Sequence, residues 1–143
     1  MRARAGAIAV VLAGFALAGC TEVEESASVG YEPAHLEEVE GSELQRVTFT
    51  REGADRTGLR TDVVERDGAQ RVVPYASLIY DGEGKTWVYT LRRPLTFQRA
   101  EVNVDRVERD RALIAEGPPA GTRVVTVGAS EVYGAELEIA GGH

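Results

Sequence analysis

The chain has 143 residues, of which 43% are hydrophobic and 27% are charged, and its formal net charge is -7. This length and composition suit one modest globular domain. The acidic balance argues against nucleic acid as a partner, because binding to phosphates requires a basic surface.

Residues 1–19 have the pattern of a secretory signal peptide. Two arginines open the chain, and residues 5–18 are apolar except for glycine. This apolar run is shorter than the roughly twenty residues that a helix needs to cross a bilayer. It ends in small residues that favour cleavage, directly before Cys20.

Residues 17–20 read Leu-Ala-Gly-Cys and resemble the lipobox of bacterial lipoproteins. The resemblance implies that the signal is cut just before Cys20 and that this cysteine is lipidated. The protein would then be held in the cell envelope, on the extracytoplasmic face of a bacterial membrane. Each buried CH₂ group contributes about 0.8 kcal/mol, so two or three acyl chains make a stable anchor. The alternative is an ordinary secretory signal with an incidental cysteine.

Residues 20–45 are predicted to be an acidic flexible tether. From residue 21 to 43 the chain has eight glutamates and no lysine or arginine, and its apolar residues follow no sustained period. Such a segment cannot bury enough surface to offset its ordering entropy. Cys20 is the only cysteine, so no disulfide can order the segment.

Residues 46–140 are predicted to form a β domain. It begins with a short strand at 47–49, followed by a helix at 51–57. Thr50 suits the N-cap of that helix, and Gly58 suits a left-handed cap at its end. Further strands are predicted at 59–65, 71–74, 77–80, 86–91, 112–115 and 122–127.

The Gly-Lys-Thr at 84–86 could end a phosphate-binding loop or turn a hairpin. A loop of the Walker type needs a glycine five positions before the Gly-Lys pair, where this chain has Ile79, and a helix afterwards. Aromatic and β-branched residues follow instead, and they favour a strand. We therefore predict a hairpin whose second strand places Trp87, Tyr89 and Leu91 on one core face.

The last third of the chain continues the β pattern. Apolar residues change parity after Phe97, so a β-bulge is predicted near Gln98 and Arg99. One helical turn is predicted at 128–133 and a last edge strand at 136–139. The whole pattern predicts a mainly β fold, a small antiparallel β-barrel or sandwich with one short helix.

Several pieces of this region share their order and spacing with a known family. They are VPYASLI at 73–79, GKTWVY at 84–89, GPPAGTRVVTVG at 117–128 and EVYGA at 131–135. Together they resemble the C-terminal, membrane-proximal part of periplasmic adaptor subunits, the membrane fusion protein family of bacterial efflux systems. The resemblance implies a β domain that docks on a membrane transporter. The helical hairpin and lipoyl halves of full adaptors have no counterpart in this sequence.

No arrangement of residues points to catalysis, and no enzyme activity, cofactor or metal site is expected. His35 and His143 lie in the predicted tether and at the terminus, and Cys20 would be blocked by lipid. The carboxylates at 105–110 interleave with arginines, which is more typical of a solvated turn or strand edge than of an acid/base pair.

Two functions remain open. The first is a non-catalytic accessory protein that is anchored to the membrane by lipid and docks on a transporter subunit or another envelope protein. Tyr75 and Tyr133 are its candidate contact residues. The second is a solute-binding lipoprotein, which requires an aromatic-lined pocket between sheet and helix.

Overall fold

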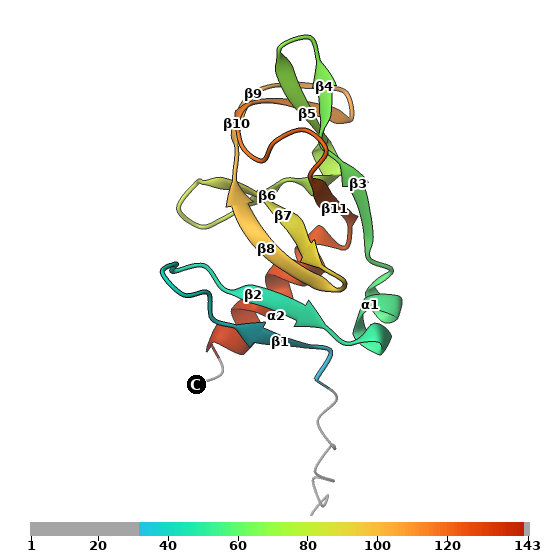
Figure 1. Cartoon of the computed structure of the whole chain (residues 1–143), viewed down its shortest axis with the longest axis vertical. Coiled ribbons are helices and arrows are strands. Elements are labelled where there is room, and N and C mark those ends of the chain that lie inside the picture. Colours follow the sequence, from blue (N-terminus) through green and yellow to red (C-terminus); the bar gives the residue numbers. More distant parts are fainter. Residues whose placement is uncertain (1–31, 142–143) are drawn as a thin grey trace, which may run out of the picture. The chain divides into compact units, whose positions relative to one another are not determined.

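The structure is a computed structural model that describes residues 32–141. Within that range the chain forms two antiparallel β-sheets and two α-helices (Figure 1). The predicted signal peptide, Cys20 and the first part of the predicted tether lie outside the described residues, as does His143.

The larger sheet has seven strands among the described residues, in the order β1-β2-β8-β7-β11-β3. β6 pairs with the start of β7. β11 pairs with the same edge of β7 further along, and β8 pairs with the opposite edge. The strands are β1 (Ala34–Glu37), β2 (Arg46–Phe49), β3 (Arg60–Val63), β6 (Ile79–Tyr80), β7 (Thr86–Arg93), β8 (Thr96–Glu101) and β11 (Arg123–Val127). The order is open, with β1 and β3 at its two ends.

The smaller sheet has four strands within residues 32–141, in the order β4-β5-β10-β9. They are β4 (Glu65–Asp67), β5 (Gln70–Pro74), β9 (Asn103–Glu108) and β10 (Arg111–Glu116). Two hairpins, β4–β5 and β9–β10, meet through the pairing of β5 with β10. A 3₁₀ turn, Tyr75–Ser77, leads from β5 back to the larger sheet.

Helix α1 (Arg51–Thr57) has the predicted ends. The hydroxyl of Thr50 accepts a hydrogen bond from the Gly53 N–H at 3.0 Å, and Gly58 closes the helix with a φ of 64°. α1 also fixes the start of the described chain, because the Thr50 N–H donates to the Pro33 carbonyl at 2.9 Å. A Cβ atom at position 53 would lie 2.3 Å from that same carbonyl oxygen, so only glycine fits there without a shift.

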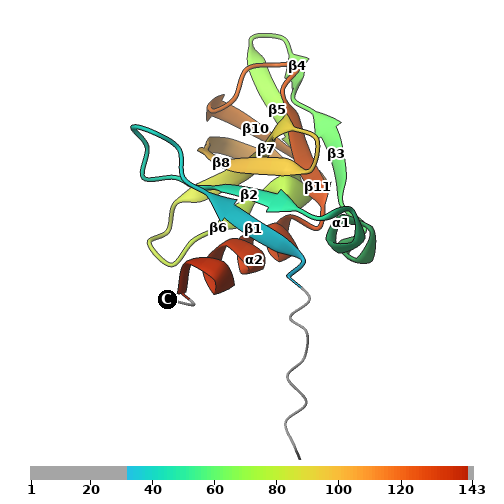
Figure 2. The same ribbon diagram turned by 60° about the horizontal axis from the view of Figure 1, so that its bottom comes forward.

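Helix α2 (Ala129–Gly141) lies along one face of the larger sheet, where it contacts β1, β2, β6 and β7 (Figure 2). It corrects two expectations. The predicted helical turn at 128–133 is the start of a longer helix, and the predicted edge strand at 136–139 is wrong because those residues continue α2. Burial against the sheet stabilises the helix beyond its first turn.

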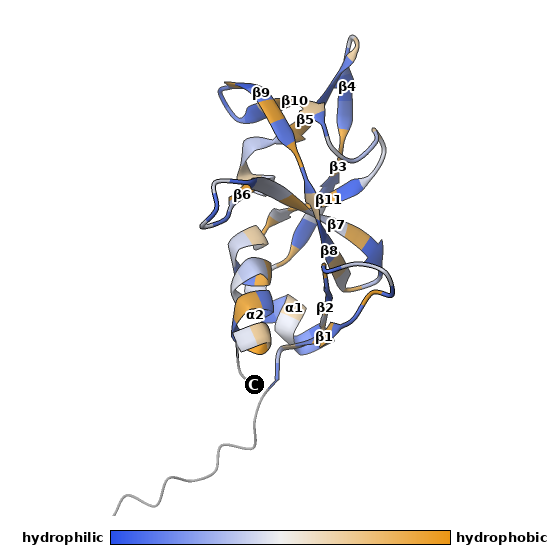
Figure 3. Ribbon diagram, turned by 90° about the vertical axis from the view of Figure 1, so that its left-hand side faces the viewer, coloured by the Kyte–Doolittle hydropathy of each residue, from blue (hydrophilic) through white to orange (hydrophobic). Residues whose placement is uncertain are grey.

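The larger sheet separates two buried clusters, which lie on its opposite faces. Figure 3 shows α2 in the lower part of the molecule and the strands of the smaller sheet, β4, β5, β9 and β10, in the upper part. The helix-side cluster consists of Ala34, Val47, Phe49, Ala54, Ile79, Trp87, Tyr89, Phe97, Val125, Ala129 and Val132. The sheet-side cluster, between the two sheets, consists of Val64, Val73, Leu78, Val88, Val102, Ala112, Ile114 and Val124. Alternate residues of β7 and β11 point into different clusters, as the pleat of a strand requires.

The predicted β-bulge near Gln98 and Arg99 is wrong. β8 pairs with β7 continuously through both residues, and the register shifts between Leu91 and Arg93 instead. Phe97 packs on the helix side and Ala100 on the sheet side. The change of parity in the sequence therefore reflects a strand buried on both faces rather than an extra residue.

The tether prediction is wrong for Ala34–Glu37. These residues form β1, which pairs with β2 along four positions from Ala34 opposite Phe49 to Glu37 opposite Arg46. Ala34 is buried and Leu36 packs against the helix-side cluster. The mainly β fold with antiparallel sheets is confirmed, and the predicted core face of Trp87, Tyr89 and Leu91 points into or against this same cluster.

Candidate functional site

The described part of the chain buries one carboxylate, that of Glu136 on α2, which is 5% exposed. Its Oε2 accepts a hydrogen bond from the Tyr89 hydroxyl at 2.5 Å. Its Oε1 lies 3.1 Å from both Nε and Nη2 of Arg99. A buried charge is tolerated only when it is paired and hydrogen-bonded, and both conditions hold here.

Strand register brings these groups together. Tyr89 on β7 pairs directly with Arg99 on β8, so both side chains project toward α2 from neighbouring positions. Trp87 lies on the same face of β7, and the Arg99 guanidinium sits 4.8 Å from the centre of its ring. The ring of Tyr133 on α2 lies 5.8 Å from the same guanidinium. Arg99 is thus held by two aromatic rings and a carboxylate.

The chemistry of this site is that of an ion pair that fixes a helix. Burial raises the pKa of Tyr89, and the nearby Glu136 carboxylate raises it further, so the phenol keeps its proton and remains a donor. Arginine stays charged at any physiological pH. The arrangement therefore attaches α2 to β7 and β8, and it offers neither a free base nor a free nucleophile.

The Gly-Lys-Thr sequence at 84–86, which could end a phosphate-binding loop or turn a hairpin, begins within the turn from Asp81 to Lys85. Asp81 Oδ1 accepts hydrogen bonds from the backbone N–H groups of Glu83 and Lys85 at 3.0 and 2.9 Å. Its Oδ2 accepts from Trp87 Nε1 at 2.8 Å. The donors that a phosphate would need are used by this carboxylate. The hairpin prediction is confirmed, with β6 pairing to β7 across the turn.

The two tyrosines predicted as contact residues lie in different settings. Tyr75 is 45% exposed and lies next to Tyr80, which is 55% exposed; we call these two residues the tyrosine pair. Burial raises the pKa of Tyr80, and the neighbouring Tyr75 adds to the shift. Tyr133 is partly buried against the helix-side cluster, where it belongs to the surroundings of Arg99. Sequence reasoning missed Tyr80 as a neighbour of Tyr75.

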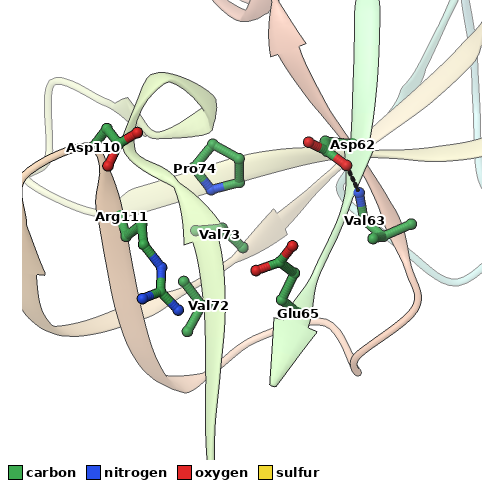
Figure 4. A pocket seen from close by; sticks show the side chains of 8 residues that line it. All are labelled: Asp62, Val63, Glu65, Val72, Val73, Pro74, Asp110 and Arg111. Atoms are coloured by element: carbon green, nitrogen blue, oxygen red, sulfur yellow. Dashed lines mark hydrogen bonds between the residues drawn. The ribbon is translucent and has the colours of Figure 1, made fainter. Parts of the chain in front are cut away.

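A small hollow of about 110 Å³ lies between β3, β4, β5 and the start of β10 (Figure 4). Asp62 and Glu65 lie on one side of it, and Asp110 and Arg111 lie on the other. Asp62 Oδ1 accepts the backbone N–H of Val63 at 2.8 Å. The hollow is small beside the 300–1,000 Å³ usual for ligand sites. Within residues 32–141 no group of three or more His, Cys, Asp or Glu side chains could hold a metal ion.

A more apolar groove of about 290 Å³ lies between α1 and the β7–β8 hairpin. Its lining includes Leu59, Leu91, Leu95 and Phe97. The space between the larger sheet and α2 is occupied by the buried side chains of Tyr89, Val132 and Glu136.

The Glu136–Arg99 pair was missed from the sequence, although a signal for it exists. Residues 129–140 contain no proline and several good helix formers, which allows one long helix. On such a helix Val132, Glu136 and Ile139 fall on one face, at spacings of four and three residues. A glutamate in that apolar line would then be expected to meet a buried cation.

Among residues 32–141, neither helix combines the length and the apolar composition that are required to span a membrane. Comparison of the chain with known protein families, curated proteins and solved structures finds no match.

Proposed function

We propose that this protein is a non-catalytic binding module that is anchored by lipid at Cys20 and docks on an envelope protein, with a membrane transporter subunit as the first candidate. The observation that carries the docking role is the tyrosine pair. The anchor rests on the lipobox-like sequence at 17–20, and the choice of a transporter rests on the resemblance to adaptor subunits.

The tyrosine pair has the properties of a contact surface. Each ring is about half exposed, and the two residues lie on neighbouring elements, the 3₁₀ turn and β6. Tyrosine combines a large apolar area with a hydroxyl that can bond at a wet rim, and it is enriched at the energetic centres of interfaces. Val107, Val127 and Leu137 are also exposed, and single exposed apolar residues are ordinary.

A solute-binding lipoprotein is the second candidate, and the groove between α1 and the β7–β8 hairpin favours it. Its volume of about 290 Å³ is near the lower end for small-molecule sites. Three leucines and Phe97 give the groove an apolar wall, and Asp55 adds one carboxylate, so it suits a mainly apolar solute.

The docking role can be tested by crosslinking in intact membranes followed by purification of the protein. We expect a transporter subunit to be enriched over an unrelated lipoprotein. Replacing both tyrosines, Tyr75→Ser with Tyr80→Ser, should lower that enrichment about tenfold or more, because interface aromatics can each contribute 2 kcal/mol or more. Leu137→Ser is the matched control, because Leu137 is 52% exposed and lies on α2. Equal enrichment in all three proteins would contradict docking through the tyrosine pair.

The anchor has a separate test. Intact-mass analysis should show acyl groups on an amino-terminal Cys20, and Cys20→Ala should move the protein from the membrane fraction to the soluble fraction. An unmodified thiol in a protein that is already soluble would rule out the anchor while leaving the docking result to stand by itself.

A further inference from the structure

A continuous set of contacts joins the surface turn at Asp81 to helix α2. The Asp81 carboxylate holds the indole N–H of Trp87 at 2.8 Å. The Arg99 guanidinium sits 4.8 Å from the centre of the Trp87 ring. Arg99 in turn reaches the Glu136 carboxylate of α2 at 3.1 Å. Trp87 thus contacts both Asp81 and Arg99, and Arg99 contacts both Trp87 and Glu136.

The turn end of this set is rigid. Asp81 uses one carboxylate oxygen for the two backbone N–H groups of the turn and the other for Trp87. The Asp81 N–H also donates to the Lys85 carbonyl at 3.0 Å, which closes the turn. The indole orientation therefore depends on the geometry of the turn, because its only N–H is committed to Asp81.

The helix end depends strongly on the polar contact. The buried residues of α2 are Ala129, Val132 and Glu136, and Tyr133, Ala135 and Ile139 pack partly buried against the helix-side cluster. Apolar contacts of this kind define the position of a helix less sharply than a directional ion pair does. The planar group of Arg99 lies over the Trp87 ring and bonds Glu136 at the same time, so a turned indole would shift the guanidinium relative to the carboxylate.

We propose that Trp87 and Arg99 transmit the geometry of the hairpin turn to α2, so that the turn controls how firmly the helix is docked on the sheet. Residues 82–85 of the turn are solvent-exposed and Asp81 is half-buried, and the turn is separated from α2 by more than forty residues of sequence. The strand before the turn, β6, also contacts α2. Anything that engages Asp81 would then loosen or tighten α2 without touching it.

Asp81→Asn tests the link selectively. An asparagine oxygen can keep both backbone hydrogen bonds of the turn, but its NH₂ group cannot accept the Trp87 N–H. Glu83→Gln is the matched control, because it removes one negative charge from the same turn without touching Trp87. Both variants and the wild type are compared as full chains by hydrogen exchange, with Trp87 fluorescence as a second readout, since it is the only tryptophan.

We expect the amides of α2 to exchange about fivefold faster in Asp81→Asn, with a shifted Trp87 emission, and to be unchanged in Glu83→Gln. The amides of β10 in the second sheet should not change in either variant. The proposal is overturned if α2 exchanges equally in the two variants, or if Asp81→Asn accelerates α2 and β10 alike, which indicates general destabilisation.

Coupling between two sites must also act in reverse. Glu136→Gln changes only the helix end, and it should increase exchange at the Glu83 and Lys85 amides of the turn and shift Trp87 emission. The same two turn amides in Leu137→Ser provide the reference. Unchanged turn amides in Glu136→Gln would overturn the link even if the Asp81 result were positive.

Discussion

The two faces of the larger sheet are built from different chemistry. The sheet-side cluster contains only Val, Leu, Ile and Ala, and it joins strands of both sheets. The helix-side cluster contains Phe49, Trp87, Tyr89 and Phe97, and the Glu136–Arg99 ion pair lies at its junction with α2. The same strands, β7 and β11, supply residues to both clusters.

The two faces of the sheet therefore have different roles. We call the sheet-side cluster the general face, because aliphatic packing has little directionality, and the helix-side cluster with its ion pair the specific face, because an ion pair requires one geometry. Aliphatic side chains gain free energy by leaving water in almost any well-packed arrangement, so they join the two sheets strongly but with little direction. The ion pair gains little by itself, because desolvation offsets the attraction, yet it penalises every position of α2 that leaves a charge unpaired. The specific face therefore sets where the helix sits.

Breaking the ion pair should have the largest effect. Arg99→Ala leaves the Glu136 carboxylate buried without its cation, and it should lower the free energy of unfolding by about 4 kcal/mol. Chemical denaturation measures this loss, and hydrogen exchange should place it first in α2. The variant Arg99→Leu with Glu136→Leu and Tyr89→Phe sharpens the comparison, because it replaces the ion pair with apolar groups of similar size and leaves no phenol hydroxyl without its acceptor, so it should recover most of the loss. A triple variant as unstable as Arg99→Ala would contradict this account of the specific face.

A cavity on the general face should lower the free energy of unfolding slightly less than loss of the ion pair does, and it should affect more strands. Ile114 is buried between the sheets, and Ile114→Ala should lower the free energy of unfolding by about 3 kcal/mol through lost burial and the cavity left behind. Because this cluster joins both sheets, exchange should increase in β5, β7 and β10 together. Val107→Ala is the control, since Val107 on β9 is exposed and should change stability by under about 0.5 kcal/mol. An effect confined to α2 would contradict the division into two faces.

The smallest effect is a pH dependence on the helix side. The Trp87 N–H lowers the pKa of Asp81 below its ordinary 3.8, burial opposes this, and the turn N–H groups and Lys85 lower it further. A lowered folded-state pKa contributes stability that is full above the ordinary value and is lost as the pH falls through the folded value. The stability advantage of the wild type over Asp81→Asn should thus be constant above about pH 5 and shrink below pH 4. Urea denaturation between pH 3 and 7 measures it, and a constant advantage throughout would contradict the assignment.

Much of the fold could be predicted because its signals are local. Thr50 and Gly58 mark the ends of α1 through cap chemistry, and both caps are confirmed. Asp81 and its neighbouring glycines mark the hairpin turn, and the alternation of Trp87 and Tyr89 marks a core face. Each of these signals depends on the φ preference or the side-chain period of a few adjacent residues.

The sequence predictions that were wrong share a physical reason, which is contact with distant parts of the chain. The segment around Ala34 has the acidic composition of a tether, yet pairing with β2 and contact with α2 order it as β1. Residues 136–139 alternate like an edge strand, but contact with the sheet keeps them helical. The candidate site was missed for the same reason, since Arg99 and Glu136 are 37 positions apart in the chain.

By itself the sequence determined the turns, the helix caps and the alternating strands, because these follow from conformational preferences that act between near neighbours. It also carries the lipobox-like cysteine, which needs no fold to be recognised. Only the tertiary structure decided that β1 joins the sheet, that both faces of β7 are buried and that Glu136 meets Arg99. Those outcomes depend on which distant segments share one core. Burial stabilises such a long-range pairing only after the whole sheet has assembled.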